Sequence, residues 1–214
     1  MNKGKFIVFE GIDGSGSTTQ SKRAFSYLVD KSKANEVLFL REPTSRSEFG
    51  LELRRRLEGK LNPEEEVTND KVHWTNLFVS DRKIHVARDI IHGIEVDYLM
   101  ICNRYMFSTL AYQSAQGMDL DELIEMHEGW CIAPDLTVYL EVPVEIASER
   151  RMRERGKDPE FFEDPGKGLL VKAAENYLRA IEKLEKLHNV VIVNGNKSIK
   201  EVAKDINPLI DKLY

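Results

Sequence analysis

Excess positive charge, clustered cysteine and long apolar stretches are all missing from this 214-residue sequence. Its 31 Lys and Arg residues are outnumbered by 36 Asp and Glu residues, and the net charge is -5. A nucleic-acid polymer is attracted by a basic field, so we expect no such partner, although a nucleotide needs only a local cationic pocket. No apolar run approaches the ~20 residues of a membrane span, so we also expect no membrane partner.

Cysteine is scarce and is not spaced as metal ligands are. Of the two cysteines, Cys102 falls in an apolar, strand-like run and is interpreted as a core residue, because a free cysteine packs as a small hydrophobic side chain. The polar residues Met1–Lys5 are too few for a signal peptide, so we expect a cytoplasmic location. With 42% apolar and 31% charged residues, the composition is typical of one globular domain over residues 1–214.

A glycine-rich stretch is the most informative feature that is present. Gly11-Ile12-Asp13-Gly14-Ser15-Gly16-Ser17-Thr18 follows an apolar run and precedes a helical one. In this context backbone N–H groups converge on phosphate oxygens, and the helix N-terminus adds a favourable dipole. The usual pattern ends in Lys, which reaches the β- and γ-phosphates, followed by Ser or Thr, which binds Mg²⁺. Thr18 is present, but Ser17 occupies the lysine position.

Strand-like and helical segments alternate along the chain, which predicts a doubly wound α/β sheet. Continuous apolar runs, typical of a parallel sheet covered on both faces, predict strands at Lys5–Glu10, Glu36–Leu40, Asp97–Asn103, Leu136–Val142 and Asn189–Asn194. Helices are predicted at Thr18–Lys33, Glu48–Glu58, Asp70–Ile94, Tyr105–Gln116, Leu120–Glu128, Val144–Arg155, Lys167–Leu187 and Ser198–Leu213, the last with a capping box at Ser198–Glu201. Ligands bind such sheets at the carboxyl ends of the strands, where the polar segments Gly11–Thr18, Arg41–Arg46 and Asn103–Arg104 fall.

Four segments, in this order, together resemble the thymidylate kinase family. They are Phe9–Gly16 with Thr18-Thr19-Gln20, then Arg41-Glu42-Pro43, then Asn103-Arg104-Tyr105 with Ser108–Gln113, and last Ala133–Thr137. The resemblance implies a three-layer P-loop NTPase fold, in which helices flank a five-stranded parallel sheet, and a short lid at about residues 150–165. It also implies a nucleoside-monophosphate-kinase-like domain that transfers a phosphoryl group from ATP to dTMP, giving dTDP and ADP for dTTP synthesis.

The resemblance further implies two nucleotide sites. At the ATP site, all residues from Gly11 to Thr18 surround the phosphates, and the Thr18 hydroxyl binds the Mg²⁺ that accompanies ATP. At the dTMP site, Arg104 grips the acceptor phosphate with the planar fork of its guanidinium. Arg41 and Arg46 are further candidates for this phosphate, and their order is left open.

The thymidine pocket is implied residue by residue. Phe78 would stack on thymine, and Arg82, one helical turn later on the same face, would hydrogen-bond a base carbonyl. Thr109 would approach the base edge, Tyr112 would close against the sugar, and Asp13 would approach the 3′-hydroxyl. Other interpretations stay open: Phe78 and Tyr112 as core residues, and Arg82 as a surface ion-pair partner of Asp81 or of neighbouring glutamates. The resemblance also raises the prospect of a cis peptide before Pro43, and it implies a homodimer.

The lid is expected to carry positive charge. Arg150, Arg151, Arg153, Arg155 and Lys157 precede or enter the turn-prone stretch 156–165. One branch of the family has a catalytic Arg in the phosphate loop, where this chain has Gly14 or Ser15, whereas the other branch supplies the cation from the lid. This chain fits the second branch, with Arg153 and Arg155 as catalytic candidates beside Arg104. For Arg150 and Arg151 a solvated helix face is the competing interpretation.

Three positions depart from the family pattern. Ser17 replaces the loop Lys, Asn103 replaces an Asp, and Glu141 stands where Asp often follows the fourth strand. Loss of a charge-stabilising donor lowers a rate by ~10²–10³ when nothing replaces it. Two functions therefore remain: a working kinase whose lid arginines compensate for the missing lysine, or a weak or inactive paralogue that binds nucleotides as a sensor or scaffold.

Overall fold

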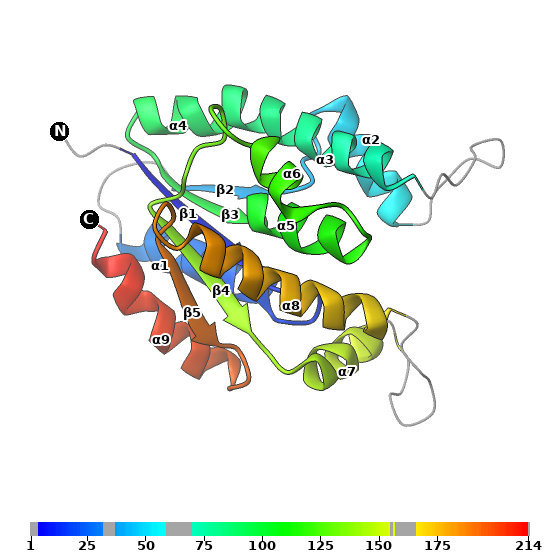
Figure 1. Ribbon diagram of the computed structural model, residues 1–214. Helices are drawn as coiled ribbons and strands as arrows, with labels where there is room; N and C mark the ends of the chain where they lie inside the picture. The colour runs from blue at the N-terminus through cyan, green and yellow to red at the C-terminus, as the bar shows by residue number, and fades with distance from the viewer. Residues whose placement is uncertain (1–3, 32–36, 59–69, 155, 157–165, 214) are drawn as a thin grey trace.

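The computed structural model describes residues 4–31, 37–58, 70–154, 156 and 166–213 (Figure 1). Its centre is a five-stranded parallel sheet in the order β2-β3-β1-β4-β5. The strands are β1 (Lys5–Glu10), β2 (Val37–Arg41), β3 (Leu99–Asn103), β4 (Leu136–Glu141) and β5 (Val190–Asn194). All five predicted strands are confirmed, with bounds that shift by at most two residues.

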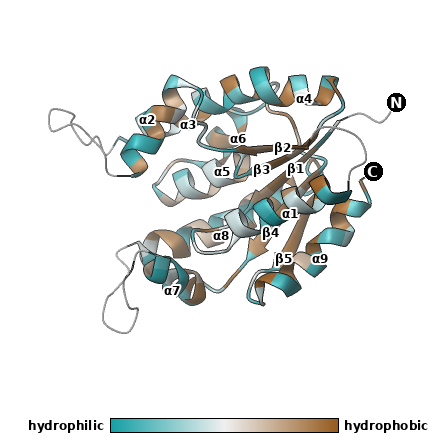
Figure 2. Ribbon diagram, turned by 180° about the vertical axis from the view of Figure 1, so that it is seen from behind, coloured by the Kyte–Doolittle hydropathy of each residue, from teal (hydrophilic) through white to brown (hydrophobic). Residues whose placement is uncertain are grey.

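Helices cover both faces of the sheet, which confirms the three-layer α/β prediction. They are α1 (Ser17–Lys31), α2 (Glu48–Leu57), α3 (Lys71–His85), α4 (Ile91–Glu95), α5 (Met106–Ala115), α6 (Leu120–Glu125), α7 (Val144–Glu154), α8 (Lys167–Leu184) and α9 (Ile199–Asp211). Apolar side chains of α1 and α9 pack on one face of the sheet, and those of α5, α6, α7 and α8 pack on the other. Figure 2 shows the hydrophobic strands enclosed between these helices.

The core follows from the apolar runs that predicted the strands. Phe6 and Val8 of β1 face one cluster, and Ile7 and Phe9 face the other, because successive strand side chains point to opposite faces. Cys102 is fully buried in the first cluster, as predicted. No helix in the described part of the chain is long and apolar enough to cross a membrane.

Two helical predictions have different outcomes. The capping box that starts α9 is confirmed, since the Ser198 hydroxyl accepts from the Glu201 N–H while the Glu201 carboxylate accepts from the Ser198 N–H. The single helix predicted over Asp70–Ile94 is interrupted by a π-helical turn at Val86–Ile90, labelled η1, between α3 and α4. Apolar periodicity does not reveal one inserted residue, so the turn was not predicted. The cis peptide between Glu42 and Pro43 is present.

Candidate active site

The glycine-rich stretch forms a loop between the carboxyl end of β1 and the start of α1, as predicted. The Ser15 N–H donates to the Ile12 carbonyl at 2.9 Å, which closes a tight turn inside the loop. Gly14 has a φ of 85°, and a Cβ there would collide with the carbonyl oxygen of Ala147 in α7. Gly16 has a φ of 93°, yet a Cβ there would meet nothing within 4 Å. The loop is therefore packed against α7 at Gly14 and open at Gly16.

The missing lysine leaves Ser17 buried at the first residue of α1. A cation nevertheless lies against this loop. The Arg150 guanidinium of α7 donates to the Gly195 carbonyl at 3.3 Å and approaches the Gly14 carbonyl at 3.5 Å. Arg150 is half-buried and contacts backbone carbonyls, so it is not fully solvated. Arg153 is exposed and lies 3.9 Å from Glu149, and Arg155 lies outside the described residues, with most of the predicted lid.

Next to the loop, the carboxyl end of β3 brings an amide to Thr18. The Asn103 Nδ2 group donates to the Thr18 hydroxyl oxygen at 3.2 Å. The Asn103 Oδ1 atom is buried and has no partner among the described residues. A buried amide oxygen without a partner is unusual, because the great majority of buried polar atoms are hydrogen-bonded. The pair Thr18 and Asn103 thus offers two uncharged oxygen ligands at the position where the sequence predicts a metal.

Arg104 is the centre of a charged cluster that follows β3. Its backbone has a φ of 69°, and its N–H donates to the Phe9 carbonyl at 2.9 Å. The guanidinium lies 2.5 Å from the Asp13 carboxylate and 5.4 Å from the ring centre of Tyr112. The Tyr112 hydroxyl accepts from the Asp13 N–H at 2.8 Å. Three residues predicted for the acceptor site therefore lie together, beside the phosphate loop.

Burial keeps the Tyr112 hydroxyl protonated. Desolvation raises the pKa of Tyr112 to about 12, although the Arg104 charge opposes this shift. The side chain is half-buried and contacts the core without belonging to its fully buried set. The hydroxyl is therefore available as a hydrogen-bond donor at the mouth of the site.

Glu10, the last residue of β1, lies behind Arg104 and was not predicted as a site residue. Its carboxylate is fully buried and accepts from the Tyr105 N–H at 2.8 Å and from the hydroxyls of Ser108 and Tyr177 at 2.6 and 3.0 Å. Burial raises the pKa of Glu10, while Ser108 and the Arg104 charge act in the opposite direction. The sequence held a signal for this residue, since a carboxylate that ends an apolar strand is a buried charge in need of partners.

Arg82 is fully buried on α3, and its ion-pair partner is Glu42, so the interpretation as a surface pair with Asp81 is wrong. The Arg82 guanidinium contacts Glu42 at 2.7 Å, and its Nη2 atom donates to the Thr109 hydroxyl at 2.9 Å. Asp81 instead accepts from the N–H of Thr44 at 2.7 Å. The structure thus brings together two predicted base-pocket residues, Arg82 and Thr109. Phe78 lies one turn before Arg82, is half-buried and does not belong to the fully buried core.

Two histidines complete this buried network, and neither was predicted. His85 lies 2.9 Å from one oxygen of Glu42, and the Nε2 atom of His127 lies 2.7 Å from Arg82. Burial alone would raise the pKa of Glu42, but the Arg82 and His85 interactions hold it below its usual value. Burial, with the Arg82 charge, lowers the pKa of His127 to about 3. His127 is therefore neutral, so its Nε2 atom accepts the hydrogen bond from Arg82.

The two further candidates for the acceptor phosphate lie in different surroundings. Arg41 ends β2, is exposed, and pairs in register with Asn103 of β3, beside Arg104. Burial lowers the pKa of Arg54, and the neighbouring Arg41 charge lowers it further, so two cations lie close together at this edge. Arg46 is exposed and pairs with Asp89 at 3.5 Å. The geometry therefore favours Arg41 over Arg46 as the second phosphate ligand.

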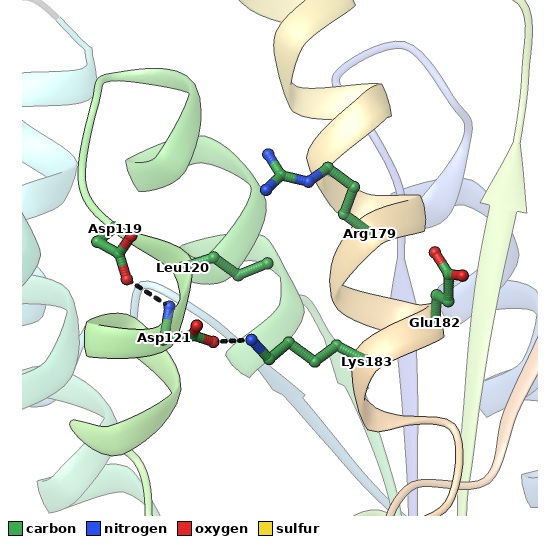
Figure 3. A pocket seen from close by; sticks show the side chains of 6 residues that line it. All are labelled: Asp119, Leu120, Asp121, Arg179, Glu182 and Lys183. Atoms are coloured by element: carbon green, nitrogen blue, oxygen red, sulfur yellow. Dashed lines mark hydrogen bonds and ion pairs between the residues drawn. The ribbon is translucent and has the colours of Figure 1, made fainter.

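A surface pocket of about 260 Å³ lies apart from these residues, between α6 and α8 (Figure 3). Its lining carries charges of both signs, and Lys183 is paired with Asp121 across it. It contains none of the predicted site residues; the lining consists of Asp119, Leu120, Asp121, Arg179, Glu182 and Lys183. Charges that are already paired across an open surface give no reason to place a ligand there.

Comparisons with known proteins identify the family. The family model of thymidylate kinase matches residues 9–206. A probable thymidylate kinase of Pyrococcus horikoshii is 38% identical over 211 residues, which cover 97% of this chain and 96% of the relative. A thymidylate kinase of Desulfotalea psychrophila is 33% identical over 207 residues, which cover 96% and 93% of the two chains. The fold resembles a crystal structure of thymidylate kinase from Ehrlichia chaffeensis, with a TM-score of 0.72 at 22% identity, covering 98% and 99% of the two chains.

Proposed function

Because the chain belongs to the thymidylate kinase family, and is therefore a nucleoside monophosphate kinase, we propose that it transfers the γ-phosphoryl group of ATP to dTMP. The products are dTDP and ADP, and the reaction serves dTTP synthesis. The observation that carries the proposal is that the phosphate loop and the Arg104 cluster lie side by side, at the carboxyl ends of neighbouring strands. The loop from Gly11 to Thr18 ends β1, and the cluster of Arg104, Asp13 and Tyr112 follows β3, its immediate neighbour.

In the proposed reaction the loop N–H groups hold the phosphates of ATP while Arg104 and Arg41 hold the phosphate of dTMP. Transfer is in line and needs no covalent enzyme intermediate, so positioning and charge stabilisation supply the catalysis. The acceptor phosphate would replace Asp13 on the exposed side of Arg104. The released Asp13 carboxylate would then be free to accept from the sugar 3′-hydroxyl, with Tyr112 closing the sugar pocket.

The thymine base would stack on Phe78 and be read by Arg82 and Thr109. Arg82 already has partners in Glu42, His127 and Thr109, so its direction is set before a ligand binds. Prior orientation supports the proposal, because a preorganised donor lowers the entropy that is lost on binding.

Arginines of α7 and the lid would replace the missing lysine. Arg150 lies against the loop, which supports α7 as a carrier of positive charge to the ATP site. Arg153 and Arg155 follow on the same segment and are proposed to reach the γ-phosphoryl when the lid closes and excludes water. Guanidinium groups suit this role, since they stay charged and bind phosphate oxygens in pairs.

The proposed Mg²⁺ would accompany ATP, and the residues present fit such an ion. The Thr18 hydroxyl and the unpartnered Oδ1 atom of Asn103 are oxygen ligands of the kind that Mg²⁺ binds beside substrate phosphates. When bound, the ion would neutralise charge that develops on the phosphoryl oxygens. Both ligands are uncharged, so most of the binding energy would come from the phosphates of the nucleotide.

A second candidate function is a nucleotide-binding sensor or scaffold, favoured by the two neutral residues Ser17 and Asn103. One coupled assay separates the candidates, with ATP, Mg²⁺ and a panel of dTMP, dUMP, dCMP, dGMP and AMP. We expect turnover that is fastest with dTMP. Binding of ATP and dTMP without turnover would support the sensor instead.

We also propose a homodimer that works in the cytoplasm, as the resemblance to the family implies. Apolar side chains of α3 and α4 support the dimer, since Val72 is 48% and Ile91 is 38% exposed. Light scattering after size exclusion tests it, with a mass of about twice the 24.6 kDa of the chain expected.

A further inference from the structure

Arg104 lies between two carboxylates that differ in exposure. On its outer side the Asp13 side chain is 48% exposed and lies 2.5 Å away. On its inner side Glu10 is fully buried and reaches Arg104 through the hydroxyls of Ser108 and Tyr177. Among the described residues no ion pair joins Glu10 to a cation directly. The outer carboxylate can therefore be exchanged for a ligand, whereas the inner arrangement is enclosed by protein.

The two hydroxyls lie between Glu10 and Arg104. The Ser108 oxygen lies 2.6 Å and the Tyr177 oxygen 3.0 Å from the Oε2 atom of Glu10, and the two hydroxyl oxygens lie 2.8 Å from each other. Glu10 therefore accepts at least one of the two hydroxyl protons, and both hydroxyl oxygens present lone pairs to Arg104. The Nη1 atom of Arg104 donates to these oxygens, at 3.1 Å to Ser108 and 3.4 Å to Tyr177.

The geometry points to Tyr177 and Ser108 as positioning residues that hold one edge of Arg104 so that its other edge can bind the acceptor phosphate. Tyr177 comes from α8 and Ser108 from α5, so two helices that pack on each other fix the guanidinium from behind. This inference rests on the proposed function, in which Arg104 binds the phosphate of dTMP. It adds that α8 contributes to substrate selection through one hydroxyl.

The test replaces Tyr177 with Phe, which removes the hydroxyl and keeps the ring. Tyr139→Phe is the matched control, because Tyr139 is equally buried and its ring lies 5.0 Å from that of Tyr177. Calorimetry with dTMP and with thymidine isolates the phosphate contribution. We expect Tyr177→Phe to weaken dTMP binding about tenfold, the size of one hydrogen bond to a charged group, and to leave thymidine binding and the KM for ATP within twofold.

A double-mutant cycle separates positioning from a structural role. In an Arg104→Gln background, Tyr177→Phe should no longer change dTMP binding, because the group that it orients is gone. Ser108→Ala removes the other hydroxyl that orients Arg104, so it should also weaken dTMP binding. This variant decides the question if Tyr177→Phe does not fold.

Several outcomes would overturn the inference. The role of the two hydroxyls alone is rejected if Tyr177→Phe leaves dTMP binding intact, weakens dTMP and thymidine binding equally, or keeps its effect in the Arg104→Gln background. A wild-type protein that binds thymidine as tightly as dTMP would instead reject the phosphate role of Arg104, and with it the proposed function.

Discussion

A phosphate loop without lysine has to take positive charge from another residue. Ser17 is buried at the position that the lysine usually occupies, and Arg150 approaches the same loop from α7. The loop therefore keeps its backbone donors and gains a guanidinium. In the proposed reaction, Arg104 would serve the acceptor phosphate and the α7 arginines the donor.

Restoring the lysine measures how complete this replacement is. If arginines already stabilise the transferred phosphoryl group, Ser17→Lys should raise kcat on dTMP by less than about tenfold, whereas loss of an uncompensated donor is worth ~10²–10³. Ser17→Ala is the control for the loss of the serine hydroxyl. A gain of a hundredfold or more in Ser17→Lys would mean that the natural site lacks charge.

Protonation of His127 should make the stability of the protein depend on pH. Its pKa falls from 6.5 to about 3 on folding, because it is buried beside Arg82. Between pH 6.5 and about pH 3 the unfolded chain binds a proton at His127 that the folded protein does not bind. The free energy of unfolding therefore decreases as pH falls through this range, by up to about 1.4 kcal/mol per pH unit.

The variant His127→Gln keeps an acceptor for Arg82 and does not titrate. Between pH 7 and pH 5 the wild-type protein should therefore lose about 1–2 kcal/mol more of its free energy of unfolding than the variant does. Chemical denaturation at the two pH values gives the difference. Equal losses in both proteins would show that His127 is not held neutral by its surroundings.

Sequence reasoning found the site residues that belong to local motifs. Asp13, Arg104 and Tyr112 were predicted, and they lie together. The buried network was largely missed because its partners are distant in sequence: Glu42 lies 40 residues from Arg82, and His127 lies 45 residues from it. No spacing rule connects such residues, and only the folded chain, in which α3 packs against α5, brings them together.

At the scale of elements, the phosphate loop depends on its contact with α7. Gly14→Ala should push the loop away from Ala147, since the new methyl group would collide with that carbonyl oxygen. We expect ATP binding to weaken at least tenfold while dTMP binding persists, because Arg104 follows β3 and not the loop. Titration calorimetry with each nucleotide measures both.

Gly16→Ala is the matched control for this prediction. It shares the positive φ of Gly14, which costs roughly 1 kcal/mol or more for alanine, but the added methyl group meets open space. ATP binding should therefore suffer less in Gly16→Ala than in Gly14→Ala. Equal losses in the two variants would assign the effect to backbone strain and not to the contact with α7.

Whole elements were easier to predict than their interruptions. Strand bounds agree within two residues, because a parallel sheet that is covered on both faces demands unbroken apolar runs. The π-turn η1 within the predicted helix Asp70–Ile94 was missed, since one inserted residue leaves composition and apolar content unchanged.

At the scale of the whole molecule, the strand order places the glycine-rich loop and the Arg104 cluster at one edge. β1 lies between β3 and β4, so the loop that follows β1 has Arg104 on one side and α7 on the other. This order could be expected only from the resemblance to the family, because alternating strands and helices are compatible with several orders. In the proposed reaction, this arrangement would bring donor and acceptor phosphates together.

One measurement tests most directly whether arginines replace the missing lysine in phosphoryl transfer to dTMP. Turnover with ATP, Mg²⁺ and dTMP is compared between the wild-type protein and a triple variant, which carries Arg150→Ala, Arg153→Ala and Arg155→Ala. A matched variant with lysine at the three positions keeps the charge, and calorimetry follows dTMP binding in each protein. We predict that the alanine variant loses ~10²-fold or more in kcat while its dTMP affinity stays within twofold of wild type. Undiminished turnover in the alanine variant, or a wild-type protein with no turnover on dTMP, would contradict the account.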